Sequence, residues 1–264
     1  MKLLSFGAAI LVGVFSIQAS AQVSPPELYR GLTRGMSAAA AAELVLKIDG
    51  VKSARVKRNK AGIDVVDIDH KMRAGGDFGG LRGFVGLEFD SKGLMSVSIV
   101  FSEEKNSQPY CLSEGAVVYG RLEEIISMKY QELARSQMPL DGSYVNRARA
   151  FVADDHLQVL TGRKRVSHVE LASPSIDFSD GVRVVRLQSN VTSAFWYPPK
   201  SGRPEYYTPM WAGLCNADYG IRSRPRLTYL TLEDYQTEQR RKNSNAEANE
   251  RAMQDRDRLT AEKF

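Results

Sequence analysis

Two short clusters combine aspartates with a histidine, the residue types that bind divalent metal ions. Their members are Asp67, Asp69 and His70 in the first and Asp154, Asp155 and His156 in the second. We expect the first cluster to lie on a strand, where Asp67 and Asp69 share one face and His70 points to the other. One site could not use all three side chains without a bulge. We therefore predict neither a metal ion nor any other cofactor.

One spacing in the sequence is typical of a serine nucleophile. Ser102 and Lys105 have the Ser-x-x-Lys spacing, which needs the first turn of a helix so that the lysine lies one turn above the serine. Here the pair follows an expected strand and falls in a polar turn, and Gly-x-Ser-x-Gly does not occur. We therefore assign no catalytic residue. Enzymatic activity stays open, with the sequence favouring a non-enzyme.

An aromatic and proline-rich segment is the strongest candidate binding site. This aromatic loop holds both tryptophans of the chain, and its rings are Phe195, Trp196, Tyr197, Tyr206, Tyr207 and Trp211. Exposed Trp and Tyr on a stiff loop suit protein hot spots or stacking on sugars, because large rigid surfaces are ordered at low entropic cost. The alternative, which we favour, is that the rings pack inward and brace a sheet, since both residue types are commonly mostly buried.

A basic patch forms the second candidate. Its members are Lys52, Arg55, Lys57, Arg58 and Lys60. One interpretation is an anion-binding surface, and the favoured one is a solvated turn between two elements. The formal net charge of the chain is +5. Such a balance is compatible with attraction to anionic envelope surfaces, and it is also ordinary.

The segment from Phe84 to Phe101 is the element that must position these residues. Two apolar runs flank Asp90-Ser91-Lys92-Gly93, in which Asp starts a turn and Gly accepts the positive φ that closes a hairpin. Apolar residues alternate along both arms: Val85, Leu87 and Phe89 in the first, and Met95, Val97, Ile99 and Phe101 in the second. This period of two predicts an antiparallel hairpin with one buried face.

Further helices and strands are expected on both sides of the hairpin. The sequence Ser24-Pro25-Pro26-Glu27 is typical of a helix start, and a second helix is predicted over 38–47. The strongest helix begins at a Ser113 cap, with apolar residues at Val118, Leu122, Ile125, Ile126, Tyr130 and Leu133. Strands are predicted over 63–72, 151–162, 166–171, 182–187, 214–221 and 227–232. The fold class is therefore α+β, an antiparallel sheet built around the central hairpin and covered by two or more helices.

The chain has two cysteines, Cys111 and Cys215. In an oxidising compartment such a pair is most simply a disulfide, with free thiols or pairing to another chain as the alternatives. The bond would close a loop of about a hundred residues and stabilise the fold by about 4–5 kcal/mol in the chain-entropy model. It would join residues 22–140 to residues 141–232. We therefore predict a single domain over 22–232, with division into those two subdomains as the alternative.

Both ends of the chain differ in character from this domain. A basic start, an apolar run over 6–17 and small residues at Ala19 and Ala21 predict a secretory signal over 1–21, cleaved after Ala21. The compact signal is typical of bacteria, so we expect a periplasmic or secreted protein with no transmembrane segment after cleavage and no nucleic-acid partner. Residues 233–264 have few large apolar side chains and carry Glu–Lys and Glu–Arg pairs at helical spacing. They predict a charged tail, either a solvated helix or disordered.

A short motif resembles a known family. Leu32-Thr33-Arg34-Gly35-Met36-Ser37, placed before an amphipathic helix, is similar to the opening of the small α/β modules of the SmpA/OmlA outer-membrane assembly lipoproteins, to which the modules of the β-lactamase inhibitor protein are similar. The resemblance covers residues 22–101. The chain lacks the lipid-bearing cysteine of that family and adds a second large helix and a long C-terminal half. The resemblance implies an interaction module rather than an enzyme.

Together these patterns predict an exported, non-catalytic protein of the cell envelope that binds another envelope protein through the aromatic loop and the basic patch. The alternative is an envelope carbohydrate-binding protein or hydrolase that uses the aromatic loop at 195–211 on a glycan.

Overall fold

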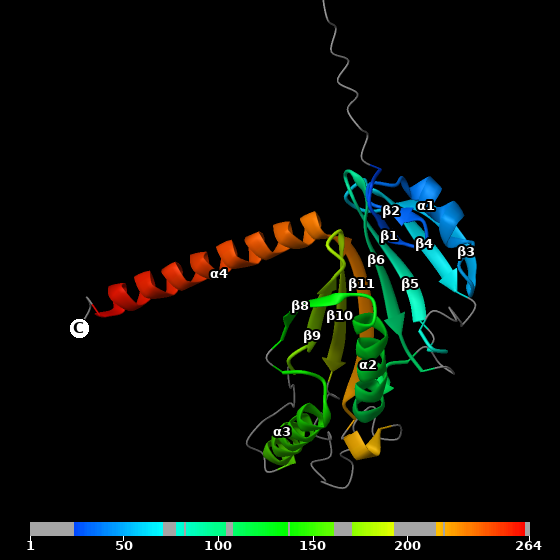
Figure 1. Cartoon of the computed structure of the whole chain (residues 1–264). Coiled ribbons are helices and arrows are strands. Elements are labelled where there is room, and N and C mark those ends of the chain that lie inside the picture. Colours follow the sequence, from blue (N-terminus) through cyan, green and yellow to red (C-terminus); the bar gives the residue numbers. More distant parts are fainter. Residues whose placement is uncertain are drawn as a thin grey trace, which may run out of the picture.

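One antiparallel sheet forms the centre of the protein (Figure 1). The computed structural model describes residues 24–70, 78–81, 83–103, 108–136, 138–160, 171–192, 215–218 and 220–261. The strands follow the order β5-β6-β11-β10-β9-β8, and β7 pairs with one end of β11. Their bounds are β5 Gly83–Asp90, β6 Gly93–Phe101, β7 Tyr110–Cys111, β8 Gln131–Arg135, β9 Ser175–Ser179, β10 Arg183–Thr192 and β11 Arg222–Thr231. The predicted α+β class with an antiparallel sheet is confirmed.

The predicted hairpin is present as β5 and β6, with Gly93 closing its turn at a φ of +108°. One detail of the prediction is wrong. The register shifts between Glu88 and Phe89, so Leu94 rather than Met95 is fully buried. A bulge adds one residue to a strand and thereby exchanges the faces of the side chains beyond it.

Helix α2 (Leu112–Ser127) covers the inner, apolar face of this sheet (Figure 1). It lies very close to β11, because a Cβ placed on Gly115 would be 2.4 Å from Ser223 Oγ. Leu122 and the ring of Tyr119 are buried in the core beneath the helix. The hydroxyl of Tyr119 donates to the carbonyl of Leu187 on β10 at 3.4 Å. A large apolar core therefore lies between α2 and the inner face.

The boundaries of α2 differ from those predicted. Its N-cap is Cys111 rather than Ser113, and the helix ends at Ser127. Tyr130 lies beyond the helix and packs against the core, whereas Leu133 is exposed on β8. The apolar residues thus keep helical spacing up to Leu133, although pairing with β9 makes Gln131–Arg135 a strand.

Residues 24–70 form an N-terminal unit that packs beside α2 on the same side of the sheet (Figure 1). Its elements are β1 Glu27–Tyr29, β2 Leu32–Thr33, α1 Ala38–Val45, β3 Val51–Arg58 and β4 Asp64–His70. Helix α1 confirms the helix predicted over 38–47, and Ser37 caps it by accepting from Ala40 N at 3.3 Å. The predicted helix start at Ser24–Glu27 is wrong, because Glu27 begins β1. The carboxylate of Glu27 accepts from Gly31 N at 2.8 Å and closes a tight turn with Gly31 at a φ of +80°.

Four members of the basic patch, Lys52, Arg55, Lys57 and Arg58, lie on a strand, and Lys60 alone lies in the turn that we favoured for all of them. Residues Val51–Arg58 form β3, which pairs antiparallel with β4. Val56 lies opposite Val66, and Arg58 lies opposite Asp64. The dense positive charge obscured the β-pattern in the sequence. Cross-strand pairing with three aspartates on β4 partly compensates this charge.

Two further strand predictions are wrong, both at the far end of the sheet, near α3 (Gly142–Leu160) (Figure 1). Residues 151–160 belong to α3 because its buried residues recur at helical spacing. Residues Asn216–Asp218 form a short 3-10 helix where a strand was expected over 214–221. The strand predicted over 166–171 lies almost wholly outside the described residues. The strands predicted over 182–187 and 227–232 are present within the longer β10 and β11.

A disulfide and a buried carboxylate hold this far end together. Cys111 and Cys215 form the predicted disulfide, with their Cα atoms 5.4 Å apart. Nearby, the fully buried carboxylate of Asp218 accepts from Ser113 N at 2.9 Å and from Ser113 Oγ at 2.7 Å. Its other oxygen accepts from Arg149 Nε at 2.9 Å and from a terminal guanidinium nitrogen at 2.5 Å. Asp218 thus caps the first turn of α2 from another part of the chain and ties it to α3.

The last described element is α4 (Leu232–Ala261), a helix of 30 residues that follows β11 directly. At a rise of about 1.5 Å per residue it is about 45 Å long. Its first turns contact β10 and β11, and the rest projects away from the sheet (Figure 1). Ion pairs Glu238–Lys242 and Glu247–Arg251 support it at i,i+4 spacing. Of the two conformations predicted for the charged tail, the helix is the one observed.

Candidate functional site

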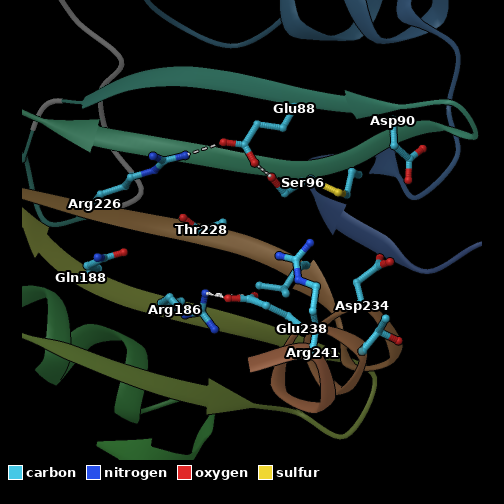
Figure 2. A pocket seen from close by; sticks show the side chains of 13 residues that line it. Glu88, Asp90, Ser96, Arg186, Gln188, Arg226, Thr228, Asp234, Glu238 and Arg241 are labelled. Atoms are coloured by element: carbon cyan, nitrogen blue, oxygen red, sulfur yellow. Dashed lines mark hydrogen bonds and ion pairs between the residues drawn. The ribbon is translucent and has the colours of Figure 1, made fainter. Parts of the chain in front are cut away.

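The outer face of the sheet carries polar side chains and a hollow of about 510 Å³ beside the start of α4 (Figure 2). We call this space the outer hollow. The strands β5 and β6 and their turn contribute Glu88, Asp90, Met95 and Ser96; β10 and β11 contribute Arg186, Gln188, Arg226, Thr228 and Leu230; and α4 contributes Asp234, Thr237, Glu238 and Arg241. This face is polar because strand side chains alternate between faces, and the inner face takes the apolar ones.

On the hairpin side of the hollow, Glu88 joins two neighbouring strands. Its carboxylate accepts from a terminal nitrogen of Arg226 on β11 at 2.9 Å and from Ser96 Oγ on β6 at 2.8 Å (Figure 2). The Nε atom of Arg226 is buried and has no hydrogen-bond acceptor among the described residues. The side chain of Glu88 remains 48% exposed, so this pair is open to a ligand in the hollow.

Arg186 forms the centre of the opposite side. Its Nε donates to Asp177 on β9 at 2.8 Å. A terminal nitrogen donates to Glu238 on α4 at 3.0 Å (Figure 2). The side chain of Arg186 is only 15% exposed. Burial acts to raise the pKa of Glu238, but hydrogen bonds from Lys242 and Arg186 outweigh it and leave that pKa below its ordinary value. Glu238 is therefore ionised at neutral pH.

Arg34 joins two of the residues that line the hollow, Asp90 at the hairpin turn and Asp234 on α4. It donates to Asp90 at 2.6 Å and to Asp234 at 2.8 Å. A third donor group reaches the carbonyl of Leu94 at 3.0 Å. Burial opposes the charge on both Arg34 and Asp90, yet their mutual pairing raises the pKa of Arg34 and lowers the pKa of Asp90. The motif that suggested the family resemblance thus connects the N-terminal unit, the hairpin and α4.

Arg241 differs from the other arginines of the hollow. Its side chain is exposed and extends from α4 over the hollow (Figure 2). No carboxylate among the described residues forms an ion pair with it, whereas Glu88, Asp90, Asp234 and Glu238 each have a cationic partner. A smaller groove of about 300 Å³ continues past Arg186 between β8, β9 and α4. The two spaces share Arg186 and Gln188.

The candidate residues predicted from the sequence lie elsewhere. All six rings of the aromatic loop, Phe195, Trp196, Tyr197, Tyr206, Tyr207 and Trp211, lie outside the described residues. Three members of the basic patch form cross-strand ion pairs: Lys52 with Asp69 at 3.6 Å, Lys57 with Asp67 at 2.5 Å and Arg58 with Asp64 at 3.0 Å. The hydrogen bond from Lys57 and its charge lower the pKa of Asp67. The positive charge of the patch is thus partly compensated, which weakens its case as an anion-binding surface.

His70 has a structural partner that the sequence did not indicate. Its Nε2 accepts from Val85 N at 3.0 Å and joins β4 to the edge of β5, while its ring meets Phe84 edge to face. Burial lowers the pKa of His70. Its side chain and those of Asp67 and Asp69 are therefore used in pairing with other groups. In the second acid–histidine cluster, Asp154 accepts from Gln158 at 2.8 Å on α3.

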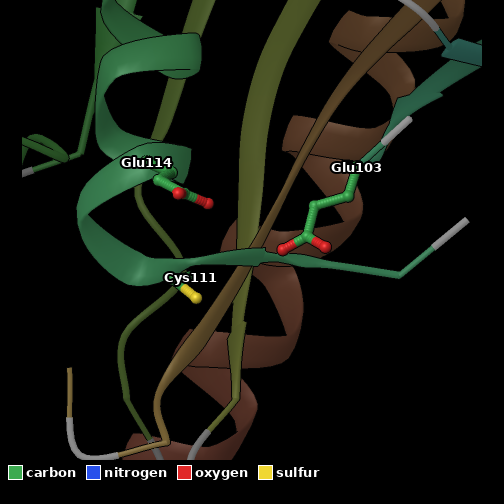
Figure 3. A group of neighbouring side chains, drawn as sticks. All are labelled: Glu103, Cys111 and Glu114. Carbon is green, nitrogen blue, oxygen red and sulfur yellow. The ribbon is translucent and has the colours of Figure 1, made fainter. Parts of the chain in front are cut away.

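A third acidic group lies at the start of α2. The carboxylates of Glu103 and Glu114 lie within 4.8 Å of Cys111 Sγ and of each other (Figure 3). The sulfur of Cys111 is bonded to Cys215, so it provides no thiolate to a metal ion. Burial raises the pKa of the adjacent Tyr110, and the two carboxylates add to this shift.

No protein-family model matches the chain, and neither a curated protein nor a solved structure matches it. Within the described part of the chain, no helix combines the length and the apolar character needed to cross a membrane. The chemistry of the outer hollow therefore carries the functional argument.

Sequence reasoning missed the outer hollow. The signal was present in β11, where Arg222, Arg224, Arg226 and Thr228 alternate with less polar residues on a strand that lies inside the sheet. Charged side chains on one face of a central strand indicate that this face is not covered by an apolar layer. The contribution of α4 could not be found in this way, because it depends on where the helix starts in space.

Proposed function

We propose that the protein is an exported, non-catalytic interaction module of the cell envelope, and that the outer hollow is where it binds another envelope protein. The observation that carries this proposal is the hollow itself, an open space of about 510 Å³ with paired charges on its walls. Such a surface suits recognition of a polar, charged segment, because partner charges can exchange with partly exposed ion pairs.

The ionisation of the wall residues supports binding over acid–base catalysis. A general acid needs a pKa raised towards neutrality, as burial in an apolar pocket provides. The pKa values of Asp90 and Glu238 are instead lowered by their arginine and lysine partners. These carboxylates are fixed as anions, which suits electrostatic recognition.

The disulfide supports an exported location. Disulfides persist in oxidising compartments and are rare in the cytosol. Cys111 and Cys215 form one between the start of α2 and the chain before β11. The proposal has three further parts. The protein is periplasmic or secreted, residues 1–21 are its leader, and its N-terminal part is similar to the SmpA/OmlA modules.

A pull-down from envelope extract with hollow-directed variants tests the proposal. Thr237→Trp places a large ring at a position that lines the hollow, and Gln236→Trp places the same ring on the neighbouring exposed position of α4. We expect the wild type and Gln236→Trp to retain the same protein partner and Thr237→Trp to lose it. Equal capture by both variants would contradict the proposed site. Retention of the protein on peptidoglycan resin, without a protein partner, would instead support the carbohydrate-binding alternative.

A further inference from the structure

The charge balance of the outer hollow indicates the chemistry of its partner. Four carboxylates line the space, and each is held by an arginine: Glu88 by Arg226, Asp90 and Asp234 by Arg34, and Glu238 by Arg186. Lys242 also contacts Glu238 at 2.6 Å, and the charge of Lys92 acts on Asp90. Each acidic side chain of the wall is therefore already paired with a cation of the protein.

Two arginines of the hollow expose positive charge to it. Arg241 extends over the hollow and forms no ion pair with any described carboxylate, and the side chain of Arg226 is 31% exposed beside Glu88. Arginine carries several N–H donors in a planar fork that matches a carboxylate, so an unpaired one at a cavity is suited to an anionic group. These two side chains come from β11 and α4, on different walls of the hollow (Figure 2).

We propose that the outer hollow binds an acidic peptide segment, with the carboxylate of an Asp or Glu side chain held by Arg241 and supported by Arg226. This inference rests on the proposed function and adds the class of partner to it. Around the arginines, Gln188 and Thr228 offer neutral polar groups to the backbone of such a segment.

The structure provides a matched pair of variants on α4. Arg241 lines the hollow, whereas Arg240 bonds within its own helix, to the carbonyl of Gln236 and to Thr237 Oγ1. Arg241→Gln and Arg240→Gln remove the same charge from adjacent exposed positions. Neither residue is in the core, so both variants are expected to fold like the wild type.

Fluorescence anisotropy with a labelled hexaglutamate peptide and a labelled hexalysine peptide gives the readout. We expect the full-length protein to bind hexaglutamate and not hexalysine, more weakly as salt is raised. Arg241→Gln should weaken binding about tenfold or more, as expected for loss of a charge-assisted hydrogen bond. Arg240→Gln should change it less than about threefold, a shift that general screening of one surface charge can produce. Absence of hexaglutamate binding, preference for hexalysine, or equal effects of the two substitutions would overturn the inference.

A competition with inorganic phosphate distinguishes a carboxylate site from a general anion site. Free glutamate serves as the reference competitor. If phosphate displaces hexaglutamate at a lower concentration than free glutamate does, the assignment to carboxylates is overturned. The outcome is separable from that of the pull-down. Hexaglutamate binding that depends on Arg241, without capture of any envelope protein, would uphold the site chemistry and refute the proposed function.

Discussion

Replacing Asp218 by alanine should destabilise the protein strongly although the residue lies far from the outer hollow. The side chain of Asp218 is 1% exposed and accepts four hydrogen bonds from Ser113 and Arg149. Removing one partner of a buried ion pair costs about 3–5 kcal/mol, and loss of a helix N-cap costs about 1 kcal/mol. Arg149 is 30% exposed and can turn partly to water, which reduces the first contribution. We therefore expect a total loss of about 3–4 kcal/mol.

Urea denaturation followed by circular dichroism measures this loss as a change in the free energy of unfolding. The melting temperature should fall by about 2–4 °C for each kcal/mol in a protein of this size. Arg149→Ala should be similarly harmful, because it leaves the carboxylate buried without its cation. The double variant should lose little more than the worse single variant, since the two side chains act as one unit.

Asp64→Ala is the matched control for this experiment. Asp64 also pairs with an arginine, Arg58, at 3.0 Å, but its side chain is 52% exposed. Exposed pairs contribute about 0–1 kcal/mol. A loss below about 1 kcal/mol for Asp218→Ala, or additive effects of the two single substitutions, would refute the argument that Asp218 caps α2 and pairs with Arg149 as a unit.

Two further predictions concern covalent and pH-dependent stability. Replacing Cys111 and Cys215 together by serine should lower the free energy of unfolding by about 2–5 kcal/mol, and the native protein denatured without reductant should show no free thiol in an Ellman assay; two titratable thiols would exclude the bond. Because burial lowers the pKa of His70, the folded protein binds fewer protons than the unfolded chain just below the ordinary value of 6.5. The contribution of His70 to stability is then fully present above about pH 6.5 and decreases as the pH falls towards its folded pKa. His70→Gln should therefore flatten the dependence of the free energy of unfolding on pH, measured by urea titrations between about pH 5 and 7.5. Parallel curves for the wild type and the variant would show that another group is responsible.

Local patterns predicted the elements that local interactions determine. The alternation around Asp90 and Gly93 predicted the hairpin, and the spacing of charges beyond Glu233 was compatible with the helix α4. The bulge that places Leu94 instead of Met95 on the buried face was not predictable, because it depends on contacts of the turn with the N-terminal unit. A Cβ on Gly93 would lie 2.4 Å from the carbonyl oxygen of Gly35, which shows how close that contact is.

The outer hollow illustrates the limit of sequence reasoning more clearly. Glu88 and Arg226 are 138 positions apart, and Arg34 and Asp234 are 200 apart. Each residue taken alone resembles an ordinary solvated charge on a strand or helix. Only the order of the strands, with β11 inserted between β6 and β10, brings them to one face. The pairing order of a sheet is not encoded in the periodicity of its individual strands.

The position of β11 also has a consequence for the kinetics of folding. The central pairing of the sheet joins β6 to β11, whose residues are more than a hundred positions apart in the chain. Until residue 231 is available, the hairpin β5–β6 exposes one edge of β6 with unpaired backbone groups beside an apolar face. Pairing over such a sequence distance is slow, because loop closure must precede any gain from the contacts. The nascent chain is therefore most vulnerable to edge-to-edge aggregation while β6 waits for its partner, and this interval is where a holding chaperone would increase the yield of native protein.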